Sequence, residues 1–306
     1  MTTYDVIIIG AGPAGLSAAL YTTRRTLSTL VLTKDIGGQT ALTNDIENYP
    51  GVDFSTGPDL MNAFAAQAKK FGAEIAFDAV TGIKPLPEGG FSISAESGKE
   101  YIARTVILST GKQPRRLSVP GEDRLMNRGV VYCATCDAPL FGDKVVAVVG
   151  GGSAAFDAAL LLTKIAKEVY LIHRRQEFRA EPILIDRARR DPKIKFILDA
   201  EIEAINGESM VEGITVKTPE GTSEIAVEGV FVEIGQIVAT EYLSEFVELN
   251  EQGEIIIDQF KATSYPGLFA AGDVTTVPYK QTIICAGEGA IAALSAYDYL
   301  QALPEK

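Results

Sequence analysis

The sequence is short of cysteine, histidine and positive charge, and each shortage excludes a class of protein. Its 306 residues include three cysteines and one histidine. Three cysteines are too few for a disulfide scaffold, so a reducing, cytoplasmic compartment is expected. Lysine and arginine number 28 against 40 aspartates and glutamates, which gives a formal net charge of −12. Nucleic acids and anionic membranes attract basic surfaces, so neither is an expected partner.

Long apolar runs are also missing. No uninterrupted apolar stretch reaches the roughly 18 residues that a membrane-spanning helix needs, so no span is expected. Residues 1–5 contain no basic run, so we expect no signal peptide. An apolar content of 46% with 22% charged residues is typical of a globular protein, and the length predicts about two domains.

Among the residues that are present, positions 133–137 stand out because they read CATCD. Cys133 and Cys136 are spaced to close a small disulfide or open to a dithiol, and Asp137 could exchange the proton that thiol chemistry moves. Half of a zinc site has the same spacing. A structural zinc site needs two further ligands, and only Cys285 and His173 are available, so the pattern favours redox chemistry and no metal.

A first nucleotide-binding motif lies near the N-terminus. The β-branched run 6–9 predicts a buried strand, residues 10–15 read GAGPAG, and a helix-prone stretch follows. A strand before and a helix after disfavour the alternative of a glycine turn without a ligand. The next strand, 28–32, leads to Thr33-Lys34 with Asp35 late, so the expected ribose-binding acid is not assigned. The predicted pyrophosphate loop consists of Gly10, Gly12, Pro13, Ala14 and Gly15.

The same unit occurs again 140 residues later. The run 145–149 predicts a buried strand, residues 150–155 read GGGSAA, and Ala155 takes the third glycine position. Residues 173–175, which read HRR, occupy the place of residues 33–35. Basic residues there suit the 2′-phosphate of NADPH better than NADH, although a solvated basic helix end is the plain alternative. The predicted second site consists of Gly150, Gly152, Ser153, Ala154, Ala155, His173, Arg174, Arg175 and Arg179.

The rest of the chain predicts an α/β protein. Thr56 is placed to cap a helix that runs through Phe71, and residues 280–300 predict a final helix. Alternation across 73–103 predicts hairpins, and the irregular stretch 113–128 predicts a domain boundary. Residues 36–39 and 47–51 are typical of turns. Further buried strands are expected at 106–108, 229–235, 254–258 and 268–273.

Taken together, these motifs resemble the low-molecular-weight thioredoxin reductase family over nearly the whole chain. The resemblance implies two Rossmann-like, three-layer ββα domains of the class II pyridine nucleotide-disulfide oxidoreductase type. It implies an FAD domain formed by 1–114 and 240–306, and an NADPH domain, 115–239, that carries the cysteine pair. The matching motifs are Gly10-x-Gly12-x-x-Gly15, Gly37-Gly38-Gln39, residues 47–51 (ENYPG), CATCD, His173-Arg174-Arg175 with Arg179, and residues 270–273 (AAGD).

The resemblance also implies a thioredoxin-disulfide reductase activity. Electrons would pass from NADPH through FAD to the Cys133–Cys136 disulfide, and on to thioredoxin or a thioredoxin-like protein. Cys136 would lie nearest the flavin, Cys133 would attack the partner, and Asp137 would donate the proton. A homodimer is also implied. Further FAD contacts are implied for Gly38, Gln39, Asn48, Thr110, Gly111, Gly272, Asp273, Gln281 and Thr282.

Several alternatives remain open at this point. Residues 275–281 and 287–290 resemble the flavoprotein component of alkyl hydroperoxide reductase, so a peroxiredoxin system is another possible destination for the electrons. A flavoprotein of this fold with ferredoxin or a deazaflavin as donor is a second alternative, and an FAD-bound redox sensor is a third. Two stretches depart from the family pattern: Ala138-Pro139 after the aspartate, and 235–240, which lacks the usual proline and asparagine. Cys285 is expected to be buried and inert.

Overall fold

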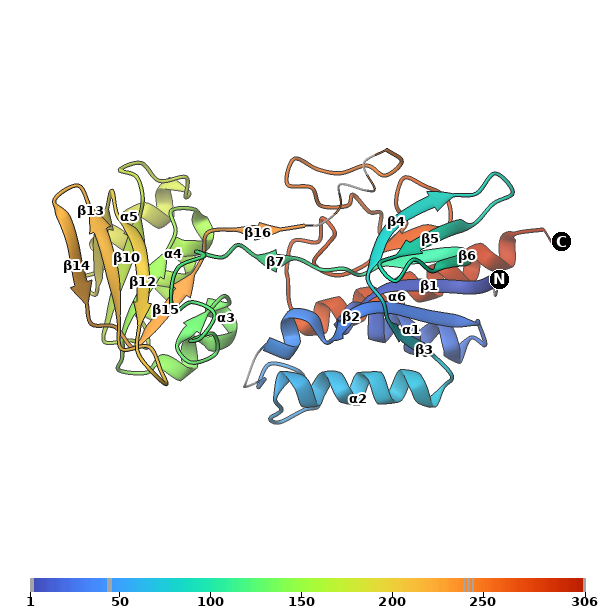
Figure 1. Cartoon of the computed structure of the whole chain (residues 1–306), viewed down its shortest axis with the longest axis horizontal. Coiled ribbons are helices and arrows are strands. Elements are labelled where there is room, and N and C mark those ends of the chain that lie inside the picture. The colour runs from blue at the N-terminus through green and yellow to red at the C-terminus, as the bar shows by residue number, and fades with distance from the viewer. Residues whose placement is uncertain (1–2, 43–45, 239, 241–242, 244, 305–306) are drawn as a thin grey trace. The chain divides into compact units, whose positions relative to one another are not determined.

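The chain divides into two compact units. The computed structural model describes residues 3–42, 46–238, 240, 243 and 245–304. Contacts between Cα atoms group Met1–Gln113 with Val238–Lys306 as unit 1 and Pro114–Ile237 as unit 2 (Figure 1). The two connections between the units pair with each other as β7 (Gln113–Pro114) and β16 (Gln236–Ile237). The boundary expected at residue 239 falls outside the described residues.

Unit 1 is built on a mixed sheet. Its strand order is β3-β2-β1-β6-β5-β4, and β17 also pairs with β6. The strands β3, β2, β1, β6 and β17 run parallel, whereas β4, β5 and β6 form an antiparallel meander. The bounds are β1 (Thr3–Ala11), β2 (Thr29–Ile36), β3 (Glu74–Phe77), β4 (Val80–Pro85), β5 (Phe91–Ala95), β6 (Glu100–Leu108) and β17 (Leu268–Ala270).

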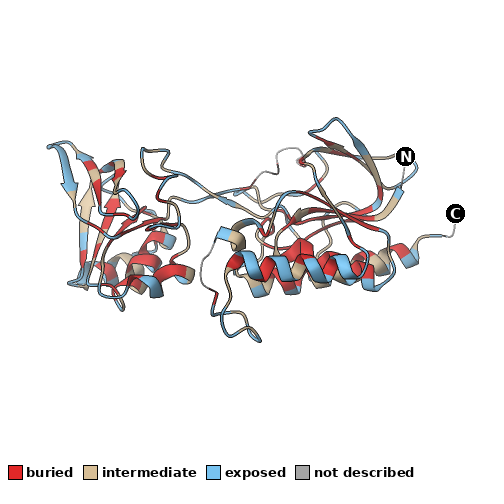
Figure 2. Ribbon diagram, turned by 60° about the horizontal axis from the view of Figure 1, so that its bottom comes forward, coloured by how far each residue is buried: buried red, intermediate tan, exposed pale blue. Residues whose placement is uncertain are grey.

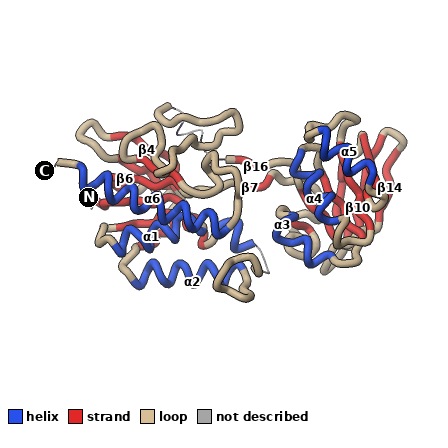
Figure 3. Tube along the Cα trace, turned by 180° about the vertical axis from the view of Figure 1, so that it is seen from behind, coloured by secondary structure: helices blue, strands red, loops and turns tan. Residues whose placement is uncertain are grey.

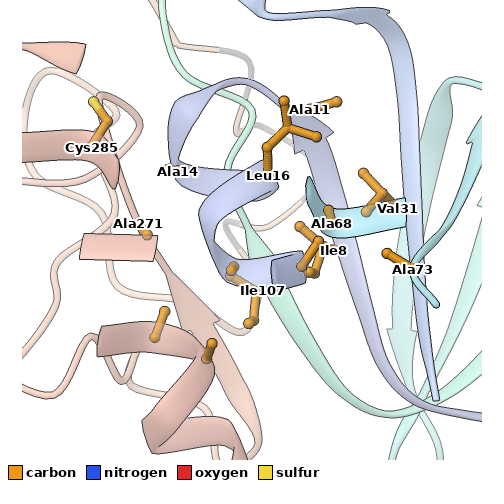
Figure 4. Packing of buried hydrophobic residues seen from close by; sticks show 14 of the residues in the cluster. Ile8, Ala11, Ala14, Leu16, Val31, Ala68, Ala73, Ile107, Ala271 and Cys285 are labelled. Atoms are coloured by element: carbon orange, nitrogen blue, oxygen red, sulfur yellow. The ribbon is translucent and has the colours of Figure 1, made fainter. Parts of the chain in front are cut away.

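The central strand β1 is buried on both faces, as a parallel strand between two layers must be. Val6 and Ile8 belong to a core with α1 (Pro13–Arg24), α2 (Gly57–Lys70) and α6 (Thr282–Ala302). Ile7 and Ile9 belong to a second core, shared with β5 and the 243–274 segment. Figure 2 shows the helices with buried inner and exposed outer faces, and Figure 4 shows the first core from close by. A 3-10 turn, η1 (Gly38–Leu42), follows β2.

Unit 2 has three layers (Figure 3). Its parallel sheet has the order β11-β10-β9-β15-β8. Val146 and Val148 of β9 pack with α4 and α5, whereas Ala147 and Val149 pack with the antiparallel sheet β12-β13-β14. The bounds are β8 (Val130–Val131), α3 (Ala134–Asp137), η2 (Ala138–Phe141), β9 (Val145–Val149), α4 (Ser153–Leu162), β10 (Glu168–His173), α5 (Pro182–Arg190), β11 (Ile194–Leu198), β12 (Glu201–Asn206), β13 (Gly213–Thr218), β14 (Gly221–Ile225) and β15 (Gly229–Val232).

Most predicted elements are confirmed, including the helix that Thr56 caps. The Thr56 hydroxyl oxygen accepts the N–H of Asp59. The helix ends at Lys70 with Phe71 as its C-cap, and Gly72 follows with φ +98°. A strand at 254–258 is wrong, because only Ile255 pairs there, in isolated bridges to Leu249 and Thr275. The hairpins predicted for 73–103 are partly wrong, because β3 pairs in parallel with β2. Local alternation reports a half-buried strand but does not identify its partner.

Candidate functional site

The first glycine loop joins β1 to α1 and is shaped by two tight contacts. Gly10 has φ +103°, and a β-carbon there would overlap the carbonyl of Ser109. A β-carbon on Gly15 would overlap the carbonyl of Gly10 and lie 2.6 Å from the Ser109 hydroxyl. These two glycines therefore allow the turn itself and the close packing of α1 against the strands.

Gly12 differs because its neighbourhood is open. A β-carbon there would lie 4.0 Å from the Gly37 carbonyl, and one on Gly38 would lie 4.0 Å from the Cα of Gly12. Gly12 is the N-cap of α1, no side chain caps the helix, and its first turn has no acid. The N–H groups of that turn are therefore available to an anion. Pro13, at the first helical position, has no backbone N–H, and this position needs none for the helix.

The structure brings the other predicted flavin residues of unit 1 together from distant parts of the chain. Asn48 Nδ2 donates to Gln281 Oε1 at 3.2 Å, and the hydroxyls of Thr40 and Thr282 lie 3.1 Å apart. Gln39 Nε2 donates to the carbonyl of Lys112, the residue after Gly111, at 2.6 Å. The Cα of Thr110 would lie 3.2 Å from a β-carbon on Gly10. These contacts form a polar rim between η1, the end of β6 and the start of α6.

The loop after β17 is fixed by α6. Gly272 donates its N–H to Glu288 Oε2 at 2.9 Å, and Lys261 Nζ pairs with Glu288 Oε1 at 2.7 Å. The thiol of Cys285 donates to Asp273 Oδ1 at 3.2 Å, and burial, followed by the charge of Asp273, raises the pKa of that thiol. Cys285 is therefore buried, as predicted, and it also holds the Asp273 carboxylate.

A set of charged groups that the sequence analysis missed lies beside this loop. Glu254 pairs with Lys112 and, at 3.4 Å, with Lys280. Lys280 Nζ also donates to the carbonyls of Asp273 and Thr275, at 3.3 and 2.6 Å. Burial, followed by the charge of Lys112, lowers the pKa of Lys280. Burial alone would raise the pKa of Glu254, but hydrogen bonds from Lys112 and Asn250, with the charges of both lysines, lower it below its usual value. Lys280 directly precedes Gln281, a predicted flavin residue, and this position in the sequence could have indicated that Lys280 lies near the site.

The end of β2 has a structural role. Thr33 Oγ1 accepts the N–H of Ala11 at 3.2 Å and donates to the carbonyl of Asp35 at 2.6 Å. Asp35 Oδ1 accepts the N–H of Gly38 at 3.0 Å. These bonds hold the glycine loop against η1. The Asp35 carboxylate, which follows β2 in the place of a ribose-binding acid, is thus already hydrogen-bonded to the backbone.

The second glycine loop repeats the first in unit 2. Gly150 has φ +155°, and a β-carbon there would lie 2.8 Å from the β-carbon of Ala155. Gly152 has open space around it and is the N-cap of α4, with no capping side chain and no acid in the first turn. Ser153 and Ala154 begin the helix. This turn can bind an anion in the same way as the first.

The basic run at the end of β10 divides into two kinds of residue. Arg174, Arg175 and Arg179 are all exposed at the surface. His173 instead places its ring against Gly151, where a β-carbon would lie 2.5 Å from Nδ1, and its Nε2 is 3.1 Å from the carbonyl of Glu177. Burial lowers the pKa of His173, and the nearby arginines add to this. The ring therefore supports the loop, whereas the three arginines hold their charges at the surface.

The cysteine pair forms a disulfide at the start of α3. Cys133 and Cys136 have Cα atoms 5.4 Å apart, and Cys133 is the N-cap, its sulfur accepting the N–H of Cys136 at 3.2 Å. Both cysteines are partly exposed, and Asp137 is buried at the end of the helix. Among the described residues, no group of three or more histidine, cysteine or acidic side chains is arranged to hold a metal ion.

Comparison with known proteins identifies the family. Residues 4–290 match the family described as pyridine nucleotide-disulphide oxidoreductase. The chain belongs to this family. It is 40% identical to a thioredoxin reductase of Listeria monocytogenes over 99% of this chain and 95% of that one. It is also 41% identical to an alkyl hydroperoxide reductase component of Pseudomonas putida, of which it spans 58%. A crystal structure of a Streptococcus pyogenes thioredoxin reductase covers 98% of this chain and 99% of its own, with 39% identity and a TM-score of 0.92.

Membership makes the chain a flavoprotein disulfide oxidoreductase that uses FAD and NADPH. The residues present fit both cofactors, because each unit has one uncapped helix N-terminus beneath an open glycine. The predicted class II fold with two Rossmann-like units is confirmed. In the part of the chain that the structure describes, no helix has the length and apolarity to cross a membrane.

Proposed function

We propose that this protein is a thioredoxin-disulfide reductase that passes electrons from NADPH to the Cys133–Cys136 disulfide and on to thioredoxin or a thioredoxin-like protein. The observation that carries the proposal is that this partly exposed disulfide lies in the same unit as the second glycine loop and its arginines. Full-length similarity to proteins named thioredoxin reductase supports it.

Each cofactor would be held by residues of one unit. In unit 1, the α1 N-terminus beneath Gly12 would bind the FAD pyrophosphate, and the rim of Gln39, Asn48, Gln281 and Thr282 would surround the rest of the group. In unit 2, the α4 N-terminus and the surface arginines would bind NADPH. Bound FAD supplies two-electron chemistry between a nicotinamide and a disulfide.

Cys133 would attack the partner disulfide once the pair is reduced. It has the N-cap position, where peptide N–H groups stabilise a thiolate, and Cys136 would then close the intramolecular disulfide and release the reduced partner. Asp137, buried one residue further on, would supply the proton. We further propose a cytoplasmic homodimer with a role in redox homeostasis, because three cysteines suit a reducing compartment and the family resemblance implies a dimer.

A peroxiredoxin system is the second candidate, because proteins named as a component of alkyl hydroperoxide reductase match 97% of this chain at 41% identity. The chain spans only 58% and 59% of those two relatives. The two candidates differ in the acceptor, so turnover with thioredoxin and with a thioredoxin-fold carrier of a peroxiredoxin would distinguish them.

The decisive test is anaerobic reduction of the bound flavin, followed by its absorbance, with NADPH or NADH as donor. We expect fast bleaching by NADPH. Because Arg174→Ala and Arg175→Ala each remove a charge-assisted hydrogen bond to the 2′-phosphate, each should weaken NADPH about tenfold or more and leave NADH little changed.

Arg187→Ala is the matched control, since Arg187 is an exposed arginine in the last turn of α5. It should leave both nucleotides unaffected. Flavin that neither nucleotide bleaches would contradict the proposed donor and favour ferredoxin or a deazaflavin. Flavin that bleaches without any reduction of a disulfide partner would favour the sensor alternative.

A further inference from the structure

Glu233 is a half-buried acid that the mechanism above does not use. It follows β15 directly, at the carboxyl edge of the unit 2 sheet, and its N–H donates to the carbonyl of Val149 at 2.9 Å. A β-carbon on Gly150 would overlap the Glu233 carbonyl. The backbone of Glu233 is therefore fixed against the second glycine turn, which fixes the point from which its side chain extends.

The Glu233 carboxylate reaches the helix that carries the disulfide. Its Oε1 accepts the N–H of Ala134 at 3.4 Å. Ala134 is the first residue of α3, and Cys133 is the N-cap of the same helix. Burial raises the pKa of Glu233 to about 7, and the Ala134 N–H only partly offsets this. The carboxylate and the sulfur of Cys133 therefore share the N–H groups of one short turn.

No charged side chain is among the causes that shift the pKa of Glu233. On the elements packed around Glu233, α3 carries Asp137, α4 carries the exposed Asp157, and the connection beside Gly235 carries Arg115. Burial and the Ala134 N–H are the two influences on the Glu233 pKa. An ionised Glu233 would add a negative charge at the N–H of Ala134, the residue that follows Cys133.

We propose that Glu233 is a positioning residue that sets the reactivity of Cys133 through the first turn of α3. An ionised Glu233 engages the Ala134 N–H and disfavours a second negative charge on the sulfur, whereas a protonated Glu233 leaves the turn free to stabilise the thiolate. The coupling is reciprocal, so a thiolate on Cys133 also favours the protonated form of Glu233. The inference rests on the proposed redox role of Cys133.

The test measures the thiol directly. In the FAD-loaded, full-length Cys136→Ser variant, reduced with a phosphine, the alkylation rate of Cys133 by iodoacetamide is followed from pH 5 to 10 by peptide mass spectrometry. We expect an inflection near neutral pH from Glu233 in addition to that of the thiol. Glu233→Gln should remove that inflection and speed alkylation near pH 7 by about tenfold, equivalent to a thiol pKa lower by about one unit.

Glu224→Gln on the exposed face of β14 makes the same chemical change and should leave the profile unaltered. Glu233→Asp keeps the charge and should keep the inflection, which a merely structural role would not predict. A Glu233→Gln profile that matches the parent would overturn the proposal, as would loss of the inflection in Glu224→Gln. Because the protein is reduced chemically, a lack of NADPH-dependent turnover would count against the proposed function and leave this result intact.

Discussion

At the scale of single residues, glycines with different surroundings do different work within one motif. Gly15 is tightly enclosed, and a β-carbon would overlap the Gly10 carbonyl. Gly12 has room for a side chain within the protein, and its φ of −76° is open to any residue. Packing therefore requires glycine at position 15, whereas only a bound ligand would require glycine at position 12.

The two residues can be separated experimentally. Gly12→Val should leave the fold intact but weaken FAD binding by about 10- to 100-fold, because the side chain would cover N–H groups that the pyrophosphate needs. Gly15→Ala should destabilise unit 1 by about 1–3 kcal/mol through overpacking. Thermal unfolding of the apoprotein and a flavin-fluorescence titration measure these effects. A large loss of stability in Gly12→Val would contradict the assignment.

At the scale of elements, buried charges connect segments that hydrophobic contact alone would not orient. The side chains of Lys261 and Glu288 are 13% and 6% exposed, and Glu288 also accepts the Gly272 N–H. This arrangement links the segment before β17, the loop after it and the helix α6. Removing one partner leaves a buried charge unpaired, which is costly, whereas an exposed pair contributes little.

Lys261→Met should therefore lower the free energy of unfolding by about 3–5 kcal/mol. Lys217→Met is the matched control, since Lys217 pairs with Glu203 on the surface, where the side chains are 62% and 42% exposed. It should cost less than about 1 kcal/mol. Urea unfolding of the two variants, followed by circular dichroism, gives both values. Equal losses would refute the role of the buried pair.

At the scale of the whole molecule, the two units have separate cores. The clusters around Ile8 and Ile7 contain residues of unit 1 alone, and those around Val148 and Ala147 contain residues of unit 2 alone. The Cys133–Cys136 disulfide and the second glycine loop belong to unit 2. A domain with its own core can fold by itself.

We therefore predict that residues 114–237 expressed alone fold cooperatively, keep the Cys133–Cys136 disulfide and bind NADPH without binding FAD. Calorimetry of the isolated unit should give a single transition, and titration calorimetry should detect the nucleotide. An isolated unit 2 without a cooperative transition would show that it depends on unit 1.

Much of the fold could be predicted from the order of residues along the sequence alone. The two glycine motifs 140 residues apart, the CATCD stretch and the alternation of strands and helices predict two Rossmann-like units, because these signals arise from neighbours along the chain. Contacts between distant segments were not predictable in this way. Glu233 looks like one polar residue in an apolar run, and only the parallel pairing of β15 with β9 brings it to α3. Likewise, the strand expected at 254–258 is absent, and Ile255 makes only isolated bridges there. Strand pairing depends on which segments the tertiary packing places side by side.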